Sequence, residues 1–383
     1  MIVYLDNSST TKEYDEVIDE IYKVSKNEFG NPSSLHHLGL EAENVIKGAR
    51  AEALKHFKSG GDIFFTSSGT EADNTAIFGV ADANKRKGKR IITTMVEHPA
   101  VLEPCMRLLE NGYDVDFISV DRNCNVNMDE LKSKLGPDVS LISVMTVNNE
   151  IGTIMPINEI KKLRDELAPS AVLHTDSVQA LGKMDLRNID ADLISCSAHK
   201  IHGPKGVGSL YIKNGVKVSP YLIGGGQEKG FRSATENTPG IIGYGKALEL
   251  TYRDFENKVT RINEMRGILR KGLIENISDI IINTPDNSVV TVLNVSFLGT
   301  RGEVILHSLE SEGIYVSTGS ACGSNHKNSK GSHVLQAMGL SSEEITGTIR
   351  FSLSEFTTKE EIEYTISKVK EAVLRFRKLG TFR

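Results

Sequence analysis

A lysine flanked by histidines follows the end of a predicted buried strand. The apolar run at residues 192–196 leads into Ser197-Ala198-His199-Lys200 and then into the glycine-rich residues 203–208. An ammonium group at the exit of a buried strand is desolvated, which lowers its pKa and frees the amine to react with a carbonyl group. The usual aldehyde that a protein lysine holds in this way is pyridoxal 5'-phosphate (PLP). Lys200 is therefore a candidate for a Schiff base to PLP, and the alternative is an ordinary surface lysine.

A second segment could bind a phosphate group. Residues 63–72 are typical of a strand, a tight turn and a helix, with Gly69 and Thr70 where the helix would begin. The first N–H groups of a helix have no partner within it, so here they could cradle a phosphate together with neighbouring hydroxyl groups. The alternative is an ordinary capped helix. No Gly-Lys-Ser/Thr sequence follows at the required spacing, so this is not a Walker A loop.

Polar residues also follow three other predicted strands. Asp176 could pair with a protonated pyridine nitrogen, or it could cap a helix. His98 could stack on a flat ring or move a proton, or it could be structural. Asn148-Asn149 could supply an amide to a phenolic oxygen. Because ligands of open α/β sheets bind beyond the carboxyl ends of the strands, these groups and Lys200 together predict one site.

A cysteine and an arginine near the C-terminus could act on a substrate. Cys322 lies in residues 317–331, which are rich in glycine and serine and have little to bury, so we expect a mobile loop. The lysines of that loop and His326 favour the thiolate. Arg350, in a strand-like run, could hold a carboxylate by two hydrogen bonds or form a structural ion pair. We expect no catalytic role for the other three cysteines, Cys105, Cys124 and Cys196.

The elements that must position these residues alternate between strands and helices. Near-continuous apolar character in several runs is typical of strands that are covered on both faces, as in a mostly parallel sheet. Segments such as 129–135 and 158–167 are typical of crossover helices. The pattern predicts an α/β domain of about seven strands. The strands are predicted at residues 62–66, 90–96, 114–120, 140–147, 171–175, 192–196 and 208–212.

The ends of the chain have a different pattern. We expect a helix at residues 12–26, a long helix over 244–277 that breaks somewhere within, and a final helix that begins with a capping box of Thr358 and Glu361. Shorter strands are predicted at residues 289–297, 314–317 and 348–352. The predicted organisation is a large PLP-binding domain, residues 16–263, and a smaller α+β domain, residues 1–15 and 264–383. The smaller domain would carry the Cys322 loop, about residues 317–333.

Composition excludes several classes of protein. The 383 residues are 39% hydrophobic and 25% charged, and the net charge of −5 gives no reason to expect nucleic acid or an anionic membrane as a partner. No apolar stretch approaches the ~20 residues that span a bilayer, and no leader peptide is recognisable, so we expect a cytoplasmic protein. The four cysteines have no metal-ligand spacing, so no metal site is predicted.

Together these motifs resemble the cysteine desulfurases of the NifS/IscS type, within the class V (fold type I) PLP enzymes. The likeness runs from residue 4 to residue 350, nearly the whole chain. Its most specific pieces are Ser197-Ala198-His199-Lys200, Asn148-Asn149-Glu150-Ile151-Gly152, Gly224-Gly225-Gly226-Gln227-Glu228 and Gly319-Ser320-Ala321-Cys322.

The resemblance implies a role for each candidate residue. Lys200 would form the Schiff base and move the Cα proton, and Asp176 would pair with the pyridine nitrogen. Arg350, with Asn149, would bind the substrate carboxylate, and Cys322 would take the sulfur of L-cysteine as a persulfide, leaving L-alanine. His98 would stack on the ring of PLP, and Asn149 and Gln179 would contact its phenolic oxygen. The phosphate would be held by Gly69, Thr70, Ser197 and His199. Thr235 would also contact the phosphate, from the second subunit of a homodimer.

The resemblance also implies partner proteins, and two alternative functions stay open. The sulfur would pass to an acceptor protein, an Fe–S scaffold or a tRNA-thiolation protein. A rival within PLP chemistry is a selenocysteine lyase or another class V enzyme. A rival of another class is a catalytically silent sulfur-carrier scaffold, against which the intact Lys200, Asp176, His98 and Cys322 argue.

Overall fold

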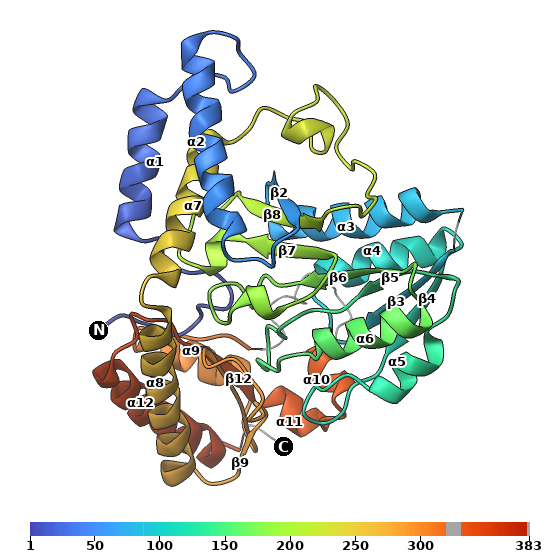
Figure 1. Cartoon of the computed structure of the whole chain (residues 1–383). Helices are drawn as coiled ribbons and strands as arrows, with labels where there is room; N and C mark the ends of the chain where they lie inside the picture. Colours follow the sequence, from blue (N-terminus) through green and yellow to red (C-terminus); the bar gives the residue numbers. More distant parts are fainter. Residues whose placement is uncertain (87, 319–330, 381–383) are drawn as a thin grey trace.

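Seven strands form one sheet at the centre of the protein (Figure 1). The computed structural model describes residues 1–86, 88–318 and 331–380. The strands lie in the order β2-β8-β7-β6-β5-β3-β4; β8 is antiparallel to β2 and β7, and the other neighbours are parallel. The predicted α/β fold with a mostly parallel sheet of seven strands is therefore confirmed. In sequence order the strands are β2 (Gly61–Thr66), β3 (Arg90–Thr94), β4 (Asp114–Ile118), β5 (Val139–Ser143), β6 (Val172–Asp176), β7 (Leu193–Ser197) and β8 (Gly208–Lys213).

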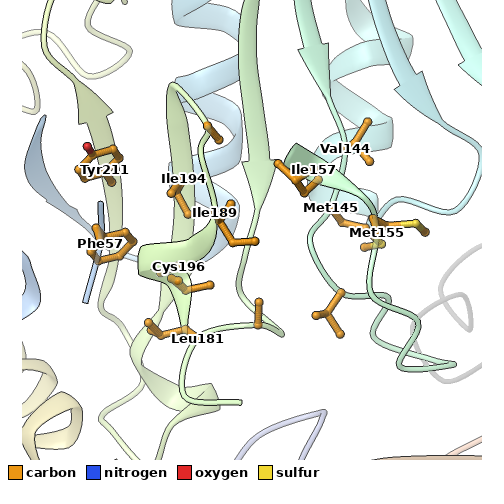
Figure 2. Close-up of a cluster of buried hydrophobic side chains, with 14 of the residues drawn as sticks. Phe57, Val144, Met145, Met155, Ile157, Leu181, Ile189, Ile194, Cys196 and Tyr211 are labelled. Atoms are coloured by element: carbon orange, nitrogen blue, oxygen red, sulfur yellow. The ribbon is translucent and has the colours of Figure 1, made fainter. Parts of the chain in front are cut away.

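Helices bury both faces of this sheet, which explains its nearly continuous apolar strands. Every residue of β5, β6 and β7 is buried. Because side chains alternate between the faces of a strand, Leu193 packs toward α3 (Gly69–Asn84) and α4 (Pro99–Glu110). Ile194 belongs to the cluster on the other face, with α5 (Met128–Lys134) and α6 (Ile157–Leu167). Figure 2 shows Ile194 and Cys196 within this second cluster.

The predicted strand at residues 140–147 is shorter in the structure, because β5 ends at Ser143. The N–H groups of Val144 and Thr146 still donate to the carbonyls of His174 and Asp176, at 3.1 and 2.9 Å. The chain therefore stays beside β6 after its regular pairing stops. The side chain of Asn148 then accepts two backbone N–H groups of the turn that follows, which carries the chain away from the sheet edge.

Three helices pack beside the sheet: α1 (Asp15–Asn27), α2 (His37–Leu54) and α7 (Thr238–Tyr252) (Figure 1). The helix predicted from residue 12 thus begins at Asp15. The predicted break in the helix over 244–277 separates α7 from α8 (Phe255–Asn276). Asp254 lies at that break with a φ of 59°, a left-handed conformation that ends a right-handed helix.

The C-terminal elements enclose a separate cluster of buried apolar side chains. The strand β10 (Val292–Phe297) lies between β9 (Ile280–Ile282) and β12 (Thr348–Ser352), antiparallel to both. The strand β1 (Val3–Tyr4) pairs in parallel with β11 (Ile314–Tyr315), so the N-terminus joins these elements. Around them pack α8, α9 (Gly302–Ser311) and α12 (Lys359–Lys378) (Figure 1). The shorter helices are α10 (His333–Ala337), α11 (Ser342–Thr346), η1 (Leu186–Asn188), η2 (Ala198–Lys200) and η3 (Glu228–Gly230).

The final helix begins as the sequence predicts. The N–H of Glu361 donates to the hydroxyl oxygen of Thr358 at 3.2 Å, and the N–H of Thr358 donates to the carboxylate of Glu361 at 2.8 Å. This capping box satisfies two backbone donors at the start of α12. Within the described ranges, none of the helices is both long and apolar enough to cross a lipid bilayer.

Candidate active site

A cavity of about 270 Å³ lies at the carboxyl ends of the parallel strands. It collects nearly all of the candidate residues, although they come from positions 69 to 350 of the chain. Thr235 is exposed and is not part of the lining, and Cys322 lies outside the described residues. A larger hollow of about 580 Å³ beside Tyr14 and Glu355 contains none of the candidates. Those that line the smaller cavity are Gly69, Thr70, His98, Asn149, Asp176, Gln179, Ser197, His199, Lys200 and Arg350.

The turn after β7 places Lys200 in the cavity wall. Residues Ala198–Lys200 form one short 3₁₀ turn directly after the buried strand. The ammonium group of Lys200 donates to the carbonyl oxygens of Ser8 and Ser9, at 2.5 and 2.7 Å. The hydroxyl of Thr11 donates to the carbonyl of His199 at 2.9 Å. The N-terminal segment thus holds both the lysine and the turn that carries it.

Asp176, the last residue of β6, is a buried carboxylate at the sheet edge. Burial raises its pKa to about 6, although the N–H of Val178, 2.8 Å from Oδ1, and the charge of Lys200 oppose that rise. A turn rather than a helix follows Asp176, so it is not a helix cap. Asp73 of α3 lines the same cavity, and burial together with the charge of Asp176 raises its pKa well above the ordinary value. A cation between these two carboxyl groups would let both ionise.

His98 presents a neutral ring to the cavity. It caps α4, and its Nδ1 accepts the N–H of Ala100 at 3.1 Å, so the neutral ring carries its proton on Nε2. Burial and the charge of Lys200 lower the pKa of His98 to about 4. At neutral pH the imidazole is therefore uncharged and flat, which suits stacking on another ring.

The start of α3 leaves a space in the cavity wall that a side chain at residue 69 would crowd. Ser68 caps the helix by accepting the N–H of Glu71 at 3.1 Å, and the next residues, Gly69 and Thr70, line the cavity. A Cβ atom on Gly69 would lie 2.7 Å from Cγ2 of Val178 and 3.4 Å from Cβ of Ser197. The unpaired N–H groups and the positive end of the helix dipole favour an anion here. The structure shows the helix cap and leaves the N–H groups at this turn placed where a phosphate could also bind, so the two predicted alternatives are compatible.

Arg350 of β12 forms an ion pair and also lines the cavity. Its Nη2 donates to the carboxylate of Asp6 and to the hydroxyl of Ser9, both at 2.8 Å, and its Nη1 donates to the carbonyl of Asn149 at 3.0 Å. The buried Nε has no hydrogen-bond partner among the described residues. The guanidinium is therefore held in position by Asp6 and lines the cavity with a fixed positive charge, which suits a substrate carboxylate.

Several residues of this site have no signal in the sequence. The acceptors from Ser8 and Ser9 are backbone carbonyls, which any residue type would supply. Asp6 gave no sign of its pairing with Arg350, from which 344 positions separate it. Asp73 had a usable signal: it is a charged residue on the apolar face of α3, among the buried residues Ala72, Ala76 and Ile77.

The three cysteines within the described residues, Cys105, Cys124 and Cys196, are buried. Burial raises the pKa of the Cys105 thiol to about 12 and raises that of the other two as well. A thiol that keeps its proton is a poor nucleophile. In the described part of the chain no group of three or more His, Cys, Asp or Glu side chains is arranged to hold a metal ion.

Comparisons with known proteins give the class of this chain. The family described as aminotransferase class V matches residues 3–365. The cysteine desulfurase IscS of Dictyoglomus turgidum is 44% identical over 386 aligned residues, which cover 100% of this chain and 97% of the relative. Among solved structures, a NifS-like protein is 36% identical with a TM-score of 0.91, covering 98% of this chain and 100% of its own. The NifS-like protein of Rickettsia africae is 29% identical with a TM-score of 0.86 over 98% of this chain and 100% of its own.

The chain therefore belongs to the class V aminotransferase family, and its cofactor is PLP. Three observations indicate that the cavity suits PLP. A Cβ atom on Gly69 would fill the space at the start of α3, the buried carboxyl of Asp176 could pair with a protonated ring nitrogen, and Lys200 lies in the same wall. The predicted resemblance is confirmed at the level of the family and of the cofactor.

Proposed function

We propose that this protein is a cysteine desulfurase, which converts L-cysteine to L-alanine and takes the sulfur onto Cys322 as a persulfide. The observation that carries the proposal is the convergence of Lys200, Asp176, His98 and Arg350 on one cavity. The named relatives, cysteine desulfurases at 40 to 44% identity over nearly the full chain, support the same activity.

The residues of the cavity divide the work of holding the cofactor. When bound, PLP supplies an electron sink for the negative charge that develops at the substrate Cα. Lys200 would hold the aldehyde carbon, and the carboxylate of Asp176 would keep the ring nitrogen protonated. The neutral ring of His98 would stack on the pyridine. The other contacts are those of Asn149 and Gln179 with the phenolic oxygen, and of Gly69, Thr70, Ser197 and His199 with the phosphate.

The substrate would be bound and cleaved by three groups. Arg350 would bind the carboxylate of L-cysteine, with Asn149 beside it, because both residues line the cavity. The amine of Lys200, once displaced by the substrate amine, would take the Cα proton and return a proton to carbon. The Cys322 thiolate would bond to the substrate sulfur as the C–S bond breaks. The electron pair of that bond would stay with the carbon skeleton, which leaves as alanine after protonation.

A homodimer would complete the site. Thr235 is exposed and outside the cavity of its own chain, so a contact with phosphate requires a second subunit. Large apolar side chains are exposed near it in sequence, with Ile223 90% exposed, and in the segment between α1 and α2, with Phe29 71% exposed. Such exposure is typical of a surface that another protein covers.

The proposal extends to the organisation and setting of the enzyme. Residues 16–263 would form the PLP-binding domain, and residues 1–15 and 264–383 the domain that carries the Cys322 loop. The separate apolar cluster around β10 and β12 supports that division. The enzyme would act in the cytoplasm and pass its sulfur to an Fe–S scaffold or a tRNA-thiolation protein.

The test is incubation of the purified protein with PLP and L-cysteine, scoring alanine and sulfide. Lys200→Ala should abolish both products, and Cys322→Ala should abolish desulfuration of cysteine. Release of selenium from selenocysteine by the Cys322→Ala protein, with no wild-type activity on cysteine, would instead indicate a selenocysteine lyase. Wild-type protein that binds no PLP would indicate a silent scaffold and overturn the proposal.

A further inference from the structure

A second lysine, Lys183, lies at the back of the candidate site. It is half-buried in the turns after β6 and borders a small cavity that Lys200 also borders. Its ammonium group donates a hydrogen bond to Oε1 of Gln179. No role in the site follows from the sequence pattern for this residue, although it is four positions from a residue that lines the PLP cavity.

The contacts of Gln179 join the two lysines. Its Nε2 donates to the carbonyl of Ser8 at 2.8 Å, and the same carbonyl accepts the ammonium of Lys200 at 2.5 Å. The chain of contacts therefore runs from Lys183 through Gln179 and Ser8 to Lys200. When Lys200 holds the aldehyde of PLP, Gln179 remains as a donor to the Ser8 carbonyl.

The ammonium group fixes which way the amide of Gln179 faces. In its charged form Lys183 can only donate, and its Nζ donates to Oε1 of Gln179, so Oε1 faces Lys183. Turning the amide over would bring its NH₂ against the ammonium and its oxygen against the Ser8 carbonyl, two repulsive contacts in place of two hydrogen bonds. In the observed orientation one amide hydrogen serves Ser8, and the second is left for the cavity.

The surroundings of Lys183 couple it to the rest of the site. Burial, then the charge of Lys200 on η2 and that of Arg350 on β12, lower the pKa of Lys183 to about 7. In return, the charge of Lys183 contributes to the lowered pKa values of His199 and His202. Lys183 is thus within electrostatic reach of the groups that would hold PLP and substrate.

We propose that Lys183 is a positioning residue, which turns the amide NH₂ of Gln179 into the cavity so that it donates to the phenolic oxygen of PLP. The inference rests on the proposed binding of PLP in this cavity. A hydrogen bond donated to the phenolic oxygen stabilises its anion and disfavours proton uptake by the bound cofactor. Loss of the donor should therefore raise the pH midpoint of the visible absorption of the bound cofactor.

The experiment titrates that absorption in the holoenzyme, without substrate, for the wild type and a set of variants. Lys183→Met should raise the midpoint by about one pH unit, a tenfold change in the proton equilibrium, and Lys183→Arg, which keeps a cationic donor, should restore it. Lys213→Met is the matched control, because Lys213 pairs with Asp190 at the far end of β8 and its loss should leave the midpoint unchanged. If Lys183→Met does not fold, Lys183→Gln, too short to reach the amide oxygen, should show the same rise.

A further variant, Gln179→Leu, separates positioning from direct charge. If Lys183 acts through Gln179, adding Lys183→Met to Gln179→Leu should raise the midpoint no further. The inference would be overturned if Lys183→Met raised the pH midpoint by the same amount in the wild-type and Gln179→Leu proteins. It would also be overturned if Lys183→Met did not raise the midpoint in the wild-type protein. Wild-type protein with no visible PLP absorption would contradict the proposed function instead, so the two failures are distinguishable.

Discussion

Two bidentate arginine–carboxylate pairs of this protein differ strongly in burial, and the more buried pair also joins segments that are distant in sequence. In the first, Nε and Nη2 of Arg232 donate to the two oxygens of Glu71 at 2.7 and 3.0 Å, and the side chains are 17% and 10% exposed. In the second, Nε and Nη2 of Arg187 donate to the two oxygens of Asp185, each at 2.8 Å, and the side chains are 64% and 30% exposed. Glu71 lies in the first turn of α3, so the first pair ties the segment before Thr235 to the proposed phosphate cradle.

Removal of the buried carboxylate should cost far more stability. Breaking a fully buried pair costs about 3–5 kcal/mol, whereas exposed pairs contribute about 0–1 kcal/mol. Glu71→Gln leaves one oxygen to accept from Ser67, and the pair is not fully dry, so we expect a loss of about 2 kcal/mol. Asp185→Asn should have an effect too small to separate from experimental error.

The assay is a double-mutant cycle for each pair, with Arg232→Met and Arg187→Met as the second changes, read as shifts in urea unfolding. The pH dependence gives a second check. Burial alone would raise the pKa of Glu71, but hydrogen bonds from Arg232 and Ser67 outweigh it and lower that pKa. A carboxyl group whose pKa falls on folding stabilises the protein above its ordinary pKa of 4.5, and this contribution is lost as the pH falls through the lowered value. Equal coupling energies for the two pairs would refute the reasoning from burial.

Three further predictions concern the cavity and the thiols. Gly69→Ala should raise the dissociation constant of PLP about tenfold, because the new Cβ would lie 2.7 Å from Cγ2 of Val178. Adding Val178→Ala should recover most of the affinity, as measured by fluorescence titration. Asp176→Asn should lower kcat roughly 10²–10³-fold with a smaller change in KM, since the lost charge acts on the transition state. Steady-state assays of alanine formation that show only a change in KM would contradict this prediction. Iodoacetamide should alkylate Cys322 alone in the native protein, because burial raises the pKa of the three other thiols. The prediction is wrong if peptide mass mapping finds a label on any of those three cysteines.

The sheet and its edge could be predicted from the sequence because both have local signals. A strand covered on both faces is buried along its length, as β5, β6 and β7 are, and favours apolar residues, while charged residues at or just after its end mark the sheet edge. Asp176 and Lys200 were recognisable in this way, since each stands at or just after the end of its strand. The joint occurrence of several such residues then predicted a single cavity.

The contacts that hold these side chains in place could not be predicted, because they depend on long-range packing. The hydrogen bonds of Lys200 go to backbone carbonyls of residues 8 and 9, and a carbonyl leaves no trace in the sequence. Lys183 stands four positions after Gln179, a spacing typical of helical neighbours, but the chain there forms turns, so only the structure shows that the two side chains meet.

The N-terminal segment sets the geometry between the two proposed reactive groups. Asp6 and Ser9 hold the guanidinium of Arg350, and the carbonyls of Ser8 and Ser9 hold the ammonium of Lys200. In the proposed reaction the guanidinium of Arg350 binds the carboxylate of the substrate, and the amine of Lys200 takes the proton from the adjacent Cα. The distance between the guanidinium and the amine must therefore suit the span from the carboxylate to the Cα of one amino acid. Because both groups are fixed by residues within four consecutive positions, a single short segment determines that distance. A shift of this segment would therefore move substrate binding and proton transfer together, because the side chains of Asp6 and Ser9 hold one group and the backbone carbonyls of Ser8 and Ser9 hold the other.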